Sequence, residues 1–426
     1  MKRGLLHLVV AFALVADWIA HAAPVGEIVE RTPFPQDVYI WQRAWNAPVR
    51  EAIEHHAPQF GTLVALGAEV SWKDQPQLIR VPVNYDLLRA TKQPIGLALR
   101  IGPYSGTFAT NGPVIRYLTD LTVSMAAEAR SNHLALQELQ IDFDCAESKL
   151  EGYRVWVDAI REKLKPVPVI ITTLPSWLKQ DSFQKLANAA DGFVLQVHSL
   201  ERPKGMDMPF SLCDPATAKA AVERASRTGV PFRVALPTYG YVMAFSKDGR
   251  FIGLSAEGPA KNWPAGVQLR EIRSDPQVIA QLVEGWTKEH PAMLKGIIWY
   301  RMPISLDILN WQWPTLSAVM AGRSPRKSLR VESRRPEPGL VEISLVNDGE
   351  ADLSSRPAVE VRWQNARLVA GDGLGGFEAM DASSNTMQFR ARANSTPVRL
   401  PPGEHQVIGW VRLNKEVEVE IETKKF

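Results

Sequence analysis

The chain has 426 residues, of which 45% are hydrophobic and 22% are charged, and these fractions are typical of globular proteins. This length is enough for one large domain and one smaller domain. The net charge is +3 and the charges are spread along the chain, so the sequence does not indicate nucleic-acid binding.

The N-terminus has the pattern of a bacterial secretory signal. Lys2-Arg3 precedes an apolar run from Leu5 to Ala16, and Ala20-His21-Ala22 is a small-x-small cleavage pattern. We therefore expect residues 1–23 to be a signal peptide that is cleaved near Ala22 or Ala23, and the protein to be periplasmic or secreted. A membrane anchor is the alternative. However, the apolar run is too short for stable membrane insertion, and we expect none.

Eight strand-like segments follow, each with a helical pattern after it, and they predict an α/β fold with a parallel sheet. The segments are Val38–Trp45, Gly61–Leu66, Ile95–Ile101, Leu136–Asp144, Val167–Thr173, Phe193–His198, Phe232–Tyr239 and Gly296–Met302. Eight such units predict a (β/α)8 TIM barrel over residues 37–323. A doubly wound sheet would normally have a glycine-rich turn after its first strand, and Trp41–Trp45 is not such a turn. Leu78–Val83 is expected in a hairpin inserted after the second strand.

The predicted helices between these strands carry apolar residues at three- and four-residue steps. They include Val114–Ala129, Tyr153–Leu164, Pro215–Arg227 and Pro276–His290. Pro215 and Pro276 suit a first helical turn, and each follows an aspartate that can cap the helix.

The composition changes after Ser324, where residues 324–340 are expected to form a linker. Residues 341–426 are expected to form a small antiparallel β-sandwich. Its predicted strands are Val341–Asn347, Ala358–Trp363, Thr386–Ala393, His405–Leu413 and Val417–Glu422. This sandwich suits a spacer or a binding module, and a structural appendage without a ligand is the favoured interpretation.

The two cysteines, Cys145 and Cys213, leave two interpretations open. They could form a disulfide in an oxidising compartment, or both could be buried thiols. Two cysteines without a spaced histidine pattern do not make a zinc site. We expect no metal and no cofactor.

The segment Leu139–Asp144 alternates apolar and polar side chains, although a strand covered by helices is normally apolar on both faces. Glu138, Gln140, Asp142 and Asp144 are expected to share one face. Two neighbouring carboxylates repel each other, so the pKa of at least one should be shifted. In a TIM barrel the carboxyl ends of the strands form the active site, and we expect this polar face to lie there.

Other strand ends supply further candidates, which are rich in carboxylates, arginines and aromatic rings. The candidate catalytic residues are Asp144, Asp142, Glu69 and Glu147, and the candidate substrate-binding residues are Trp41, Arg43, Arg100, Tyr104, Trp177, Gln196, His198, Tyr239, Trp299 and Arg301. Paired carboxylates suit glycoside hydrolysis, and aromatic faces and polar side chains suit sugar rings. For the aspartates, the structural alternative is an ionic network with an arginine. For each tryptophan, it is packing at the barrel rim.

Several motifs resemble a bacterial family known as domain of unknown function 3142. They are Tyr39–Trp45, Leu139–Asp144, Thr172–Trp177, Val194–His198 and Ala235–Gly240. The resemblance covers roughly residues 37 to 323 and implies a TIM-barrel fold, but it implies no substrate.

The fourth strand is also distantly similar to that of chitinase-like glycoside hydrolases, which carry D-x-x-D-x-D-x-E with the final Glu as the acid. Asp142 and Asp144 match the last two aspartates of this motif, whereas Leu139 replaces the first and Ala146 replaces the Glu. Glu147 lies one residue after the position that the motif assigns to this Glu. The resemblance therefore leaves a substrate-assisted mechanism without its acid.

The leading interpretation is a secreted glycoside-hydrolase-like enzyme that acts on a polysaccharide or glycan. Asp144 would be the general acid, Asp142 would tune it, and Glu69 or Glu147 would be the second carboxylate. The alternative is a non-catalytic carbohydrate-binding or cell-envelope assembly protein on the same barrel. No G-x-S-x-G elbow, P-loop or H-E-x-x-H pattern is present in the sequence.

Overall fold

The computed structural model describes residues 34–72, 75–255, 262–353, 357–392 and 399–424. The predicted signal peptide, residues 1–23, lies outside the described residues. No helix in the described part of the chain is both long enough and apolar enough to span a membrane.

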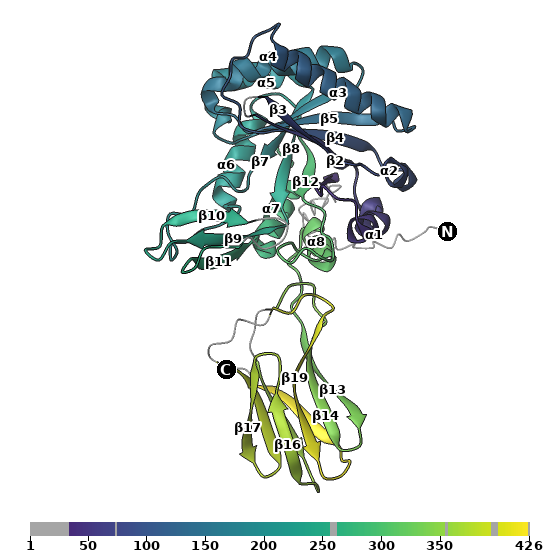
Figure 1. Cartoon of the computed structure of the whole chain (residues 1–426), viewed down its shortest axis with the longest axis vertical. Coiled ribbons are helices and arrows are strands. Elements are labelled where there is room, and N and C mark those ends of the chain that lie inside the picture. The colour runs from purple at the N-terminus through teal and green to yellow at the C-terminus, as the bar shows by residue number, and fades with distance from the viewer. Residues whose placement is uncertain (1–33, 73–74, 256–261, 354–356, 393–398, 425–426) are drawn as a thin grey trace, which may run out of the picture. The chain divides into compact units, whose positions relative to one another are not determined.

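Eight parallel strands close into a barrel, as the sequence predicted (Figure 1). They are β1 (Gln36–Ile40), β2 (Leu63–Trp72), β4 (Ile95–Ile101), β5 (Leu136–Phe143), β6 (Val169–Thr173), β7 (Gly192–Gln196), β8 (Phe232–Pro237) and β12 (Leu294–Tyr300). The strand order is β1-β12-β8-β7-β6-β5-β4-β2, and pairing of β1 with β2 closes the ring.

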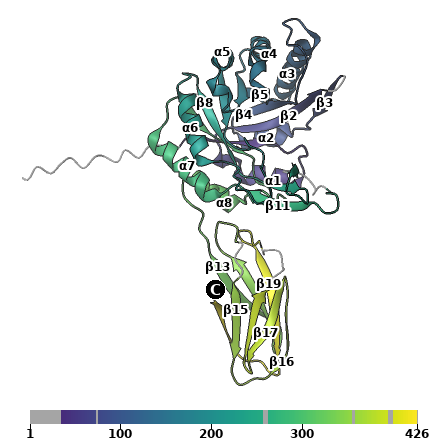
Figure 2. The ribbon, with the colours of Figure 1, turned by 90° about the vertical axis from the view of Figure 1, so that its left-hand side faces the viewer.

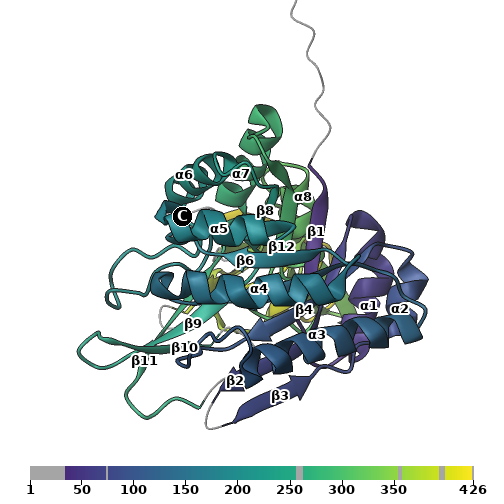
Figure 3. The same cartoon turned by 90° about the horizontal axis from the view of Figure 1, so that it is seen from above.

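Helices alternate with the barrel strands, and α3, α4 and α5 lie side by side on the outside of the barrel (Figure 3). The helices are α1 (Ala47–His56), α2 (Tyr85–Thr91), α3 (Pro113–Ser131), α4 (Leu150–Leu164), α5 (Asp181–Ala189), α6 (Pro215–Ser226), α7 (Pro276–Glu289) and α8 (Trp313–Met320). Both predicted aspartate caps are present. Asp214 Oδ1 accepts from the Thr217 amide at 2.8 Å, and Asp275 Oδ1 accepts from the Gln277 amide at 2.9 Å. These caps satisfy amide groups that a helix start leaves free.

Two insertions interrupt the regular alternation. The predicted hairpin is present, because β3 (Pro76–Arg80) pairs antiparallel with β2. A second insertion follows β8 and forms an antiparallel sheet of β9 (Gly240–Phe245), β10 (Phe251–Ser255) and β11 (Gln268–Arg273), which we call the inserted sheet. The inserted sheet was not predicted from the sequence.

The barrel interior contains a buried polar network as well as apolar side chains. Arg233 Nη1 donates to Asp37 at 2.7 Å, and Arg233 Nη2 donates to both oxygens of Glu138 at 2.7 and 2.8 Å. Gln140 Nε2 donates to Glu138 at 2.7 Å, and Tyr39 donates to Gln140 at 2.6 Å. The polar face expected along β5 is therefore divided. Glu138 and Gln140 belong to this interior network, and only the aspartates reach the mouth of the barrel.

The C-terminal domain consists of two four-stranded antiparallel sheets (Figure 2). One contains β13 (Leu329–Glu337), β14 (Leu340–Asn347), β19 (His405–Leu413) and β16 (Leu368–Gly373), and the other contains β17 (Phe377–Ser383), β18 (Thr386–Ala391), β15 (Ala358–Trp363) and β20 (Val419–Lys424). Side chains of both sheets, including Ile343 and Phe389, share one apolar core, as in the expected sandwich. The predicted linker 324–340 contains β13, so most of it is part of a sheet.

Candidate active site

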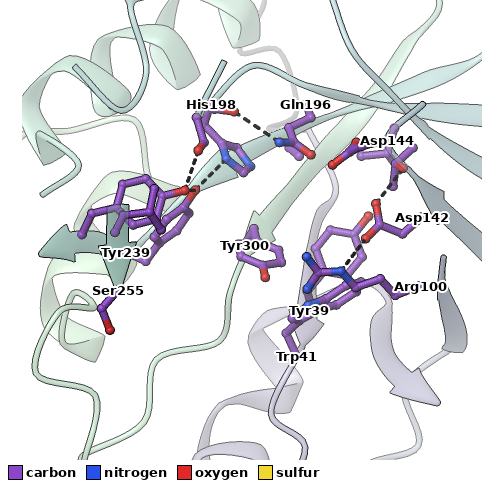
Figure 4. Close-up of a pocket in the computed structure, with 16 residues that line it drawn as sticks. Tyr39, Trp41, Arg100, Asp142, Asp144, Gln196, His198, Tyr239, Ser255 and Tyr300 are labelled. Atoms are coloured by element: carbon purple, nitrogen blue, oxygen red, sulfur yellow. Dashed lines mark hydrogen bonds and ion pairs between the residues drawn. The ribbon is translucent and has the colours of Figure 1, made fainter. Parts of the chain in front are cut away.

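A pocket of about 440 Å³ lies at the carboxyl ends of the barrel strands (Figure 4). Its volume is within the range of about 300–1,000 Å³ that is usual for small-molecule sites. The lining residues are Tyr39, Trp41, Arg100, Asp142, Asp144, Thr172, Val194, Gln196, His198, Ser199, Ala235, Tyr239, Tyr241, Leu254, Ser255 and Tyr300. They come from seven barrel strands or the loops after them, and from β9 and β10 of the inserted sheet.

Asp142 and Asp144 lie at the carboxyl end of β5, on one wall of the pocket. Phe143 between them points the other way and packs against Tyr153 and Trp156 of α4. This alternation is a property of the extended backbone, and it brings both carboxylates into the pocket.

The surroundings of the two aspartates shift their pKa values. Thr172 Oγ1 donates to Asp142 at 2.8 Å, and Arg100 Nε lies 3.9 Å from the other carboxylate oxygen. Burial nevertheless raises the pKa of Asp142, because it outweighs these two partners. Burial and the neighbouring charge of Asp142 raise the pKa of Asp144 to about 6. Asp144 therefore keeps a proton in mildly acidic solution, as a general acid requires.

A row of charged side chains continues from Asp142 to the neighbouring strands. Glu69 on β2 is in register with Arg100 on β4, which is in register with Asp142 on β5. Arg100 Nη1 lies 3.9 Å from Glu69, and Arg43 Nη2 donates to Glu69 at 2.9 Å. Glu69 thus has two arginine partners, and it lies outside the pocket lining.

The opposite wall of the pocket is uncharged and rich in hydroxyl groups. Burial lowers the pKa of His198 to about 3, so its ring is neutral. His198 Nδ1 lies 3.1 Å from the Tyr239 hydroxyl, which lies 3.0 Å from the Tyr241 hydroxyl. Tyr241 in turn forms a hydrogen bond with Ser199. His198 Nε2 is buried and has no hydrogen-bond partner in the described part of the chain.

Three aromatic rings, those of Tyr39, Trp41 and Tyr300, form a contiguous cluster in the pocket. Ring centroids are 5.2 Å apart for Tyr39 and Trp41 and 5.4 Å apart for Trp41 and Tyr300, both in edge-on contact. The hydrogen bond from Tyr39 to Gln140 connects this cluster to the interior polar network. The pocket therefore combines acidic groups, hydroxyl groups and aromatic surface, which are the groups that bind sugars.

Comparison with known proteins gives two matches to protein families. Residues 113–305 match the family described as "Domain of unknown function (DUF3142)". The expected resemblance to this family is confirmed. The matched segment is shorter than the expected 37–323, and it runs from α3 past the end of β12. Residues 330–414 match "Domain of unknown function (DUF8456)". A comparison with curated proteins found no match.

Solved structures with a similar fold include chitinases and a spore enzyme. A chitinase from Chromobacterium violaceum has 13% identity and a TM-score of 0.47, with 68% of this chain and 98% of that chain covered. The spore cortex-lytic enzyme SleL of Bacillus cereus has 12% identity and a TM-score of 0.49, with 69% and 75% covered. Chitinase ChiA74 of Bacillus thuringiensis has 10% identity and a TM-score of 0.46, with 92% and 100% covered. At these identities and TM-scores, the matches assign neither an activity nor residue roles to this chain.

The pocket gathers seven of the residues proposed from the sequence. They are Asp142, Asp144, Trp41, Arg100, Gln196, His198 and Tyr239. The first two and the last three lie in the DUF3142 segment, whereas Trp41 and Arg100 precede it.

The other proposed residues lie outside the pocket lining. Trp177 and Trp299 are 1% and 0% exposed, so both are core residues and cannot offer a face to a sugar. Arg301 is paired with Asp307, at 2.9 and 2.7 Å from its two oxygens. Glu147 accepts a hydrogen bond from Gln180, and Arg43 is paired with Glu69.

Tyr104 is also outside the pocket lining, packed against Trp72 and Trp156. Its hydroxyl donates to the Thr107 carbonyl oxygen at 3.0 Å. It therefore holds its own loop rather than facing the pocket.

Strand alternation could have identified three pocket residues that were missed. Tyr300 faces the pocket because Trp299, its neighbour on β12, faces the outer layer, where its indole donates to Gln36 at 2.7 Å. Tyr39 is two residues before Trp41 and shares its face. Thr172 lies on β6, the strand next to β5, and is the neighbour of Asp142 there. Leu254 and Ser255 had no such signal, because they come from the inserted sheet.

Both cysteines are free and buried, so Cys145 and Cys213 do not form a disulfide. Burial raises the pKa of each thiol to about 12. Within the described ranges, no group of three or more His, Cys, Asp or Glu side chains is arranged to hold a metal ion.

Proposed function

We propose that this protein is a periplasmic or secreted enzyme that cleaves a glycosidic bond in a polysaccharide or glycan. The observation that carries the proposal is the Asp142–Asp144 pair at the wall of a pocket with aromatic surface and hydroxyl groups. Glycoside hydrolysis needs one carboxyl group that is protonated and another that is charged. A pair of acidic groups whose environments differ can supply both.

Asp144 is the proposed general acid. It is the more exposed of the two aspartates, and its pKa is raised to about 6. Burial raises the pKa of Asp142 as well, but the hydrogen bond from Thr172 and the nearby Arg100 both favour its charged form. Asp142 is therefore the proposed carboxylate that stabilises positive charge on the sugar ring in the transition state. Glu147 is bound to Gln180 outside the pocket lining, so the structure does not support it as the second carboxylate.

The test uses a panel of soluble polysaccharides, chito-oligosaccharides and gluco-oligosaccharides. Cleavage is measured as the release of new reducing ends. Asp144→Asn should abolish cleavage without lowering the thermal unfolding temperature. Asp120→Asn is the matched control, because Asp120 is exposed on α3 and does not line the pocket. Unchanged activity in Asp144→Asn would contradict the role of this residue.

A non-catalytic carbohydrate-binding or cell-envelope assembly protein is the second candidate. The row of Glu69, Arg100 and Asp142 favours it, since an ionic network can be purely structural. Under this candidate Asp142→Asn should lower the free energy of unfolding by about 1 kcal/mol, because Arg100 is partly exposed and its pair with Asp142 is only partly buried. Glycans would then bind and remain intact. Unchanged stability together with lost cleavage would instead support the enzyme.

A further inference from the structure

A second cavity, of about 400 Å³, adjoins the pocket of the two aspartates. The two cavities share Ser199, Tyr241 and Leu254 in their linings. Ser199 and Tyr241 are hydrogen-bonded to each other at this boundary. A molecule bound at the aspartates could therefore extend past Tyr241 into the second cavity.

Most of the side chains that line the second cavity are of apolar types. They include Pro203, Phe210, Met243, Phe251, Ile252 and Leu254. The charged members of the lining, Glu201 and Arg202, are both exposed to solvent. The hydroxyl groups of Ser199 and Tyr241 already bond to each other, so few polar partners remain for a sugar ring. An apolar group fits this lining better.

The inserted sheet supplies the apolar wall. Met243 and Tyr241 of β9 are buried in a small apolar cluster of their own, against which Phe251 of β10 packs. Next to Phe251, Ile252 is 51% exposed, and Leu254 is 36% exposed. Large apolar side chains gathered at a cavity beside a polar pocket are a feature of ligand sites.

We propose that the second cavity binds an alkyl or aryl aglycone of the substrate while its sugar lies beside Asp142 and Asp144. The assignment of the apolar group as an aglycone rests on the proposed function. Binding of an apolar group in this cavity does not require that the protein cleaves glycans. The substrate class is then an amphiphilic glycoside, in which the sugar and the apolar group occupy adjoining cavities.

The experiment measures binding of the apolar fluorophore N-phenyl-1-naphthylamine and its displacement by alkyl β-glucosides from methyl to octyl. Each methylene that enters the cavity should tighten binding about fourfold, until the cavity is full. Ile252→Asp should weaken binding of the fluorophore at least tenfold. Leu269→Asp is the matched control, because Leu269 is 50% exposed on β11 and lines neither cavity.

Three results would overturn the assignment. They are no binding to the wild type, equal binding by Ile252→Asp and wild type, and equal weakening by Leu269→Asp. Thermal unfolding of each variant, measured in parallel, verifies that the protein tested is folded.

Cleavage assays separate this inference from the proposed function. Suppose that the wild type cleaves glycans but that Ile252→Asp leaves kcat/KM for octyl glycosides unchanged. The proposed aglycone site is then wrong, whereas the proposed glycosidase activity is supported. If Ile252→Asp weakens fluorophore binding but the wild type cleaves no glycan, the apolar site is supported and its assignment to an aglycone is overturned.

Discussion

At the scale of single residues, two aspartates separated by one position on β5 experience different surroundings. Burial raises the pKa of both, but Asp142 has a hydroxyl donor and an arginine nearby that oppose this shift, whereas the charge of Asp142 adds to it at Asp144. The pair titrates as a unit, because each charge affects the other. An acid with a pKa of about 6 works only while it is protonated, so its contribution to catalysis depends on pH.

We therefore predict that kcat for glycan cleavage falls as the pH rises through about 6. Arg100 lowers the pKa of both aspartates, so Arg100→Gln should move this alkaline limb to higher pH. Arg154→Gln is the control, since Arg154 pairs with Glu151 and Asp158 along α4. The pH profile of kcat is the measurement, and a limb that stays in place in Arg100→Gln would contradict the account.

The same pKa shift predicts a pH-dependent effect on stability. The pKa of Asp144 is raised in the folded state, so the folded state binds its proton more tightly than the unfolded state does. That contribution is complete below the ordinary carboxyl pKa and is lost as the pH rises through about 6. Asp144→Asn should therefore raise the thermal unfolding temperature relative to wild type at pH 7.5, and raise it less at pH 4. A destabilised variant at pH 7.5 would be inconsistent with this sign.

At the scale of elements, alternation along the strands determines which side chains reach the pocket. The repeated strand and helix patterns predicted all eight barrel strands, because each strand buries apolar residues against its helices. The choice of Trp299 instead of Tyr300 failed for the same physical reason, since the two faces of one strand have different surroundings. Residue type alone does not tell which face turns inward.

The inserted sheet shows a second limit of prediction from sequence. Asp248-Gly249 between β9 and β10 is a turn signal for a hairpin, and Gly249 adopts a φ of 77°. The hairpin lies between β8 and α7, where a repeating strand–helix unit normally has only a loop, so this turn was not used to predict a hairpin. Ser255 and Leu254 of the pocket were consequently not predicted.

The interior network around Arg233 should be important for stability. Arg233→Met would leave Asp37 and Glu138 buried without their cationic partner, at a cost of about 3–5 kcal/mol in the free energy of unfolding. Arg161→Met, which removes a more exposed ion pair with Asp191, should cost about 1 kcal/mol or less. Chemical denaturation measures both values. Equal costs for the two variants would show that the interior network is not a major stabilising element.

At the scale of the whole molecule, the barrel and the sandwich were each recognisable from the sequence, but the border between them was not. The predicted linker contains β13, because Pro325-Arg326-Lys327 and the segment Arg334–Gly339 resembled a linker and a turn. A strand with one solvent-exposed face and several arginines has few apolar residues from which it could be predicted. Its structure therefore depends on its pairing with β14.

We expect export of the protein to remove the first 22 or 23 residues. The basic start, apolar run and small-x-small pattern support cleavage near Ala22 or Ala23. N-terminal sequencing and intact mass of protein from the periplasm or medium of a bacterial culture would measure this. Protein that retains Met1 and stays in the cytoplasm would contradict the proposed localisation.

The most direct test of the central claim is the rate of glycosidic bond cleavage by Asp144→Asn and wild type on one substrate from the panel, at saturating concentration. Removal of a general acid typically lowers the rate by about 10²–10⁴-fold. We predict a loss in this range, with the dissociation constant for the intact glycan within a few fold of wild type. Equal rates for the two proteins, or glycan binding by wild type without any cleavage, would contradict the account.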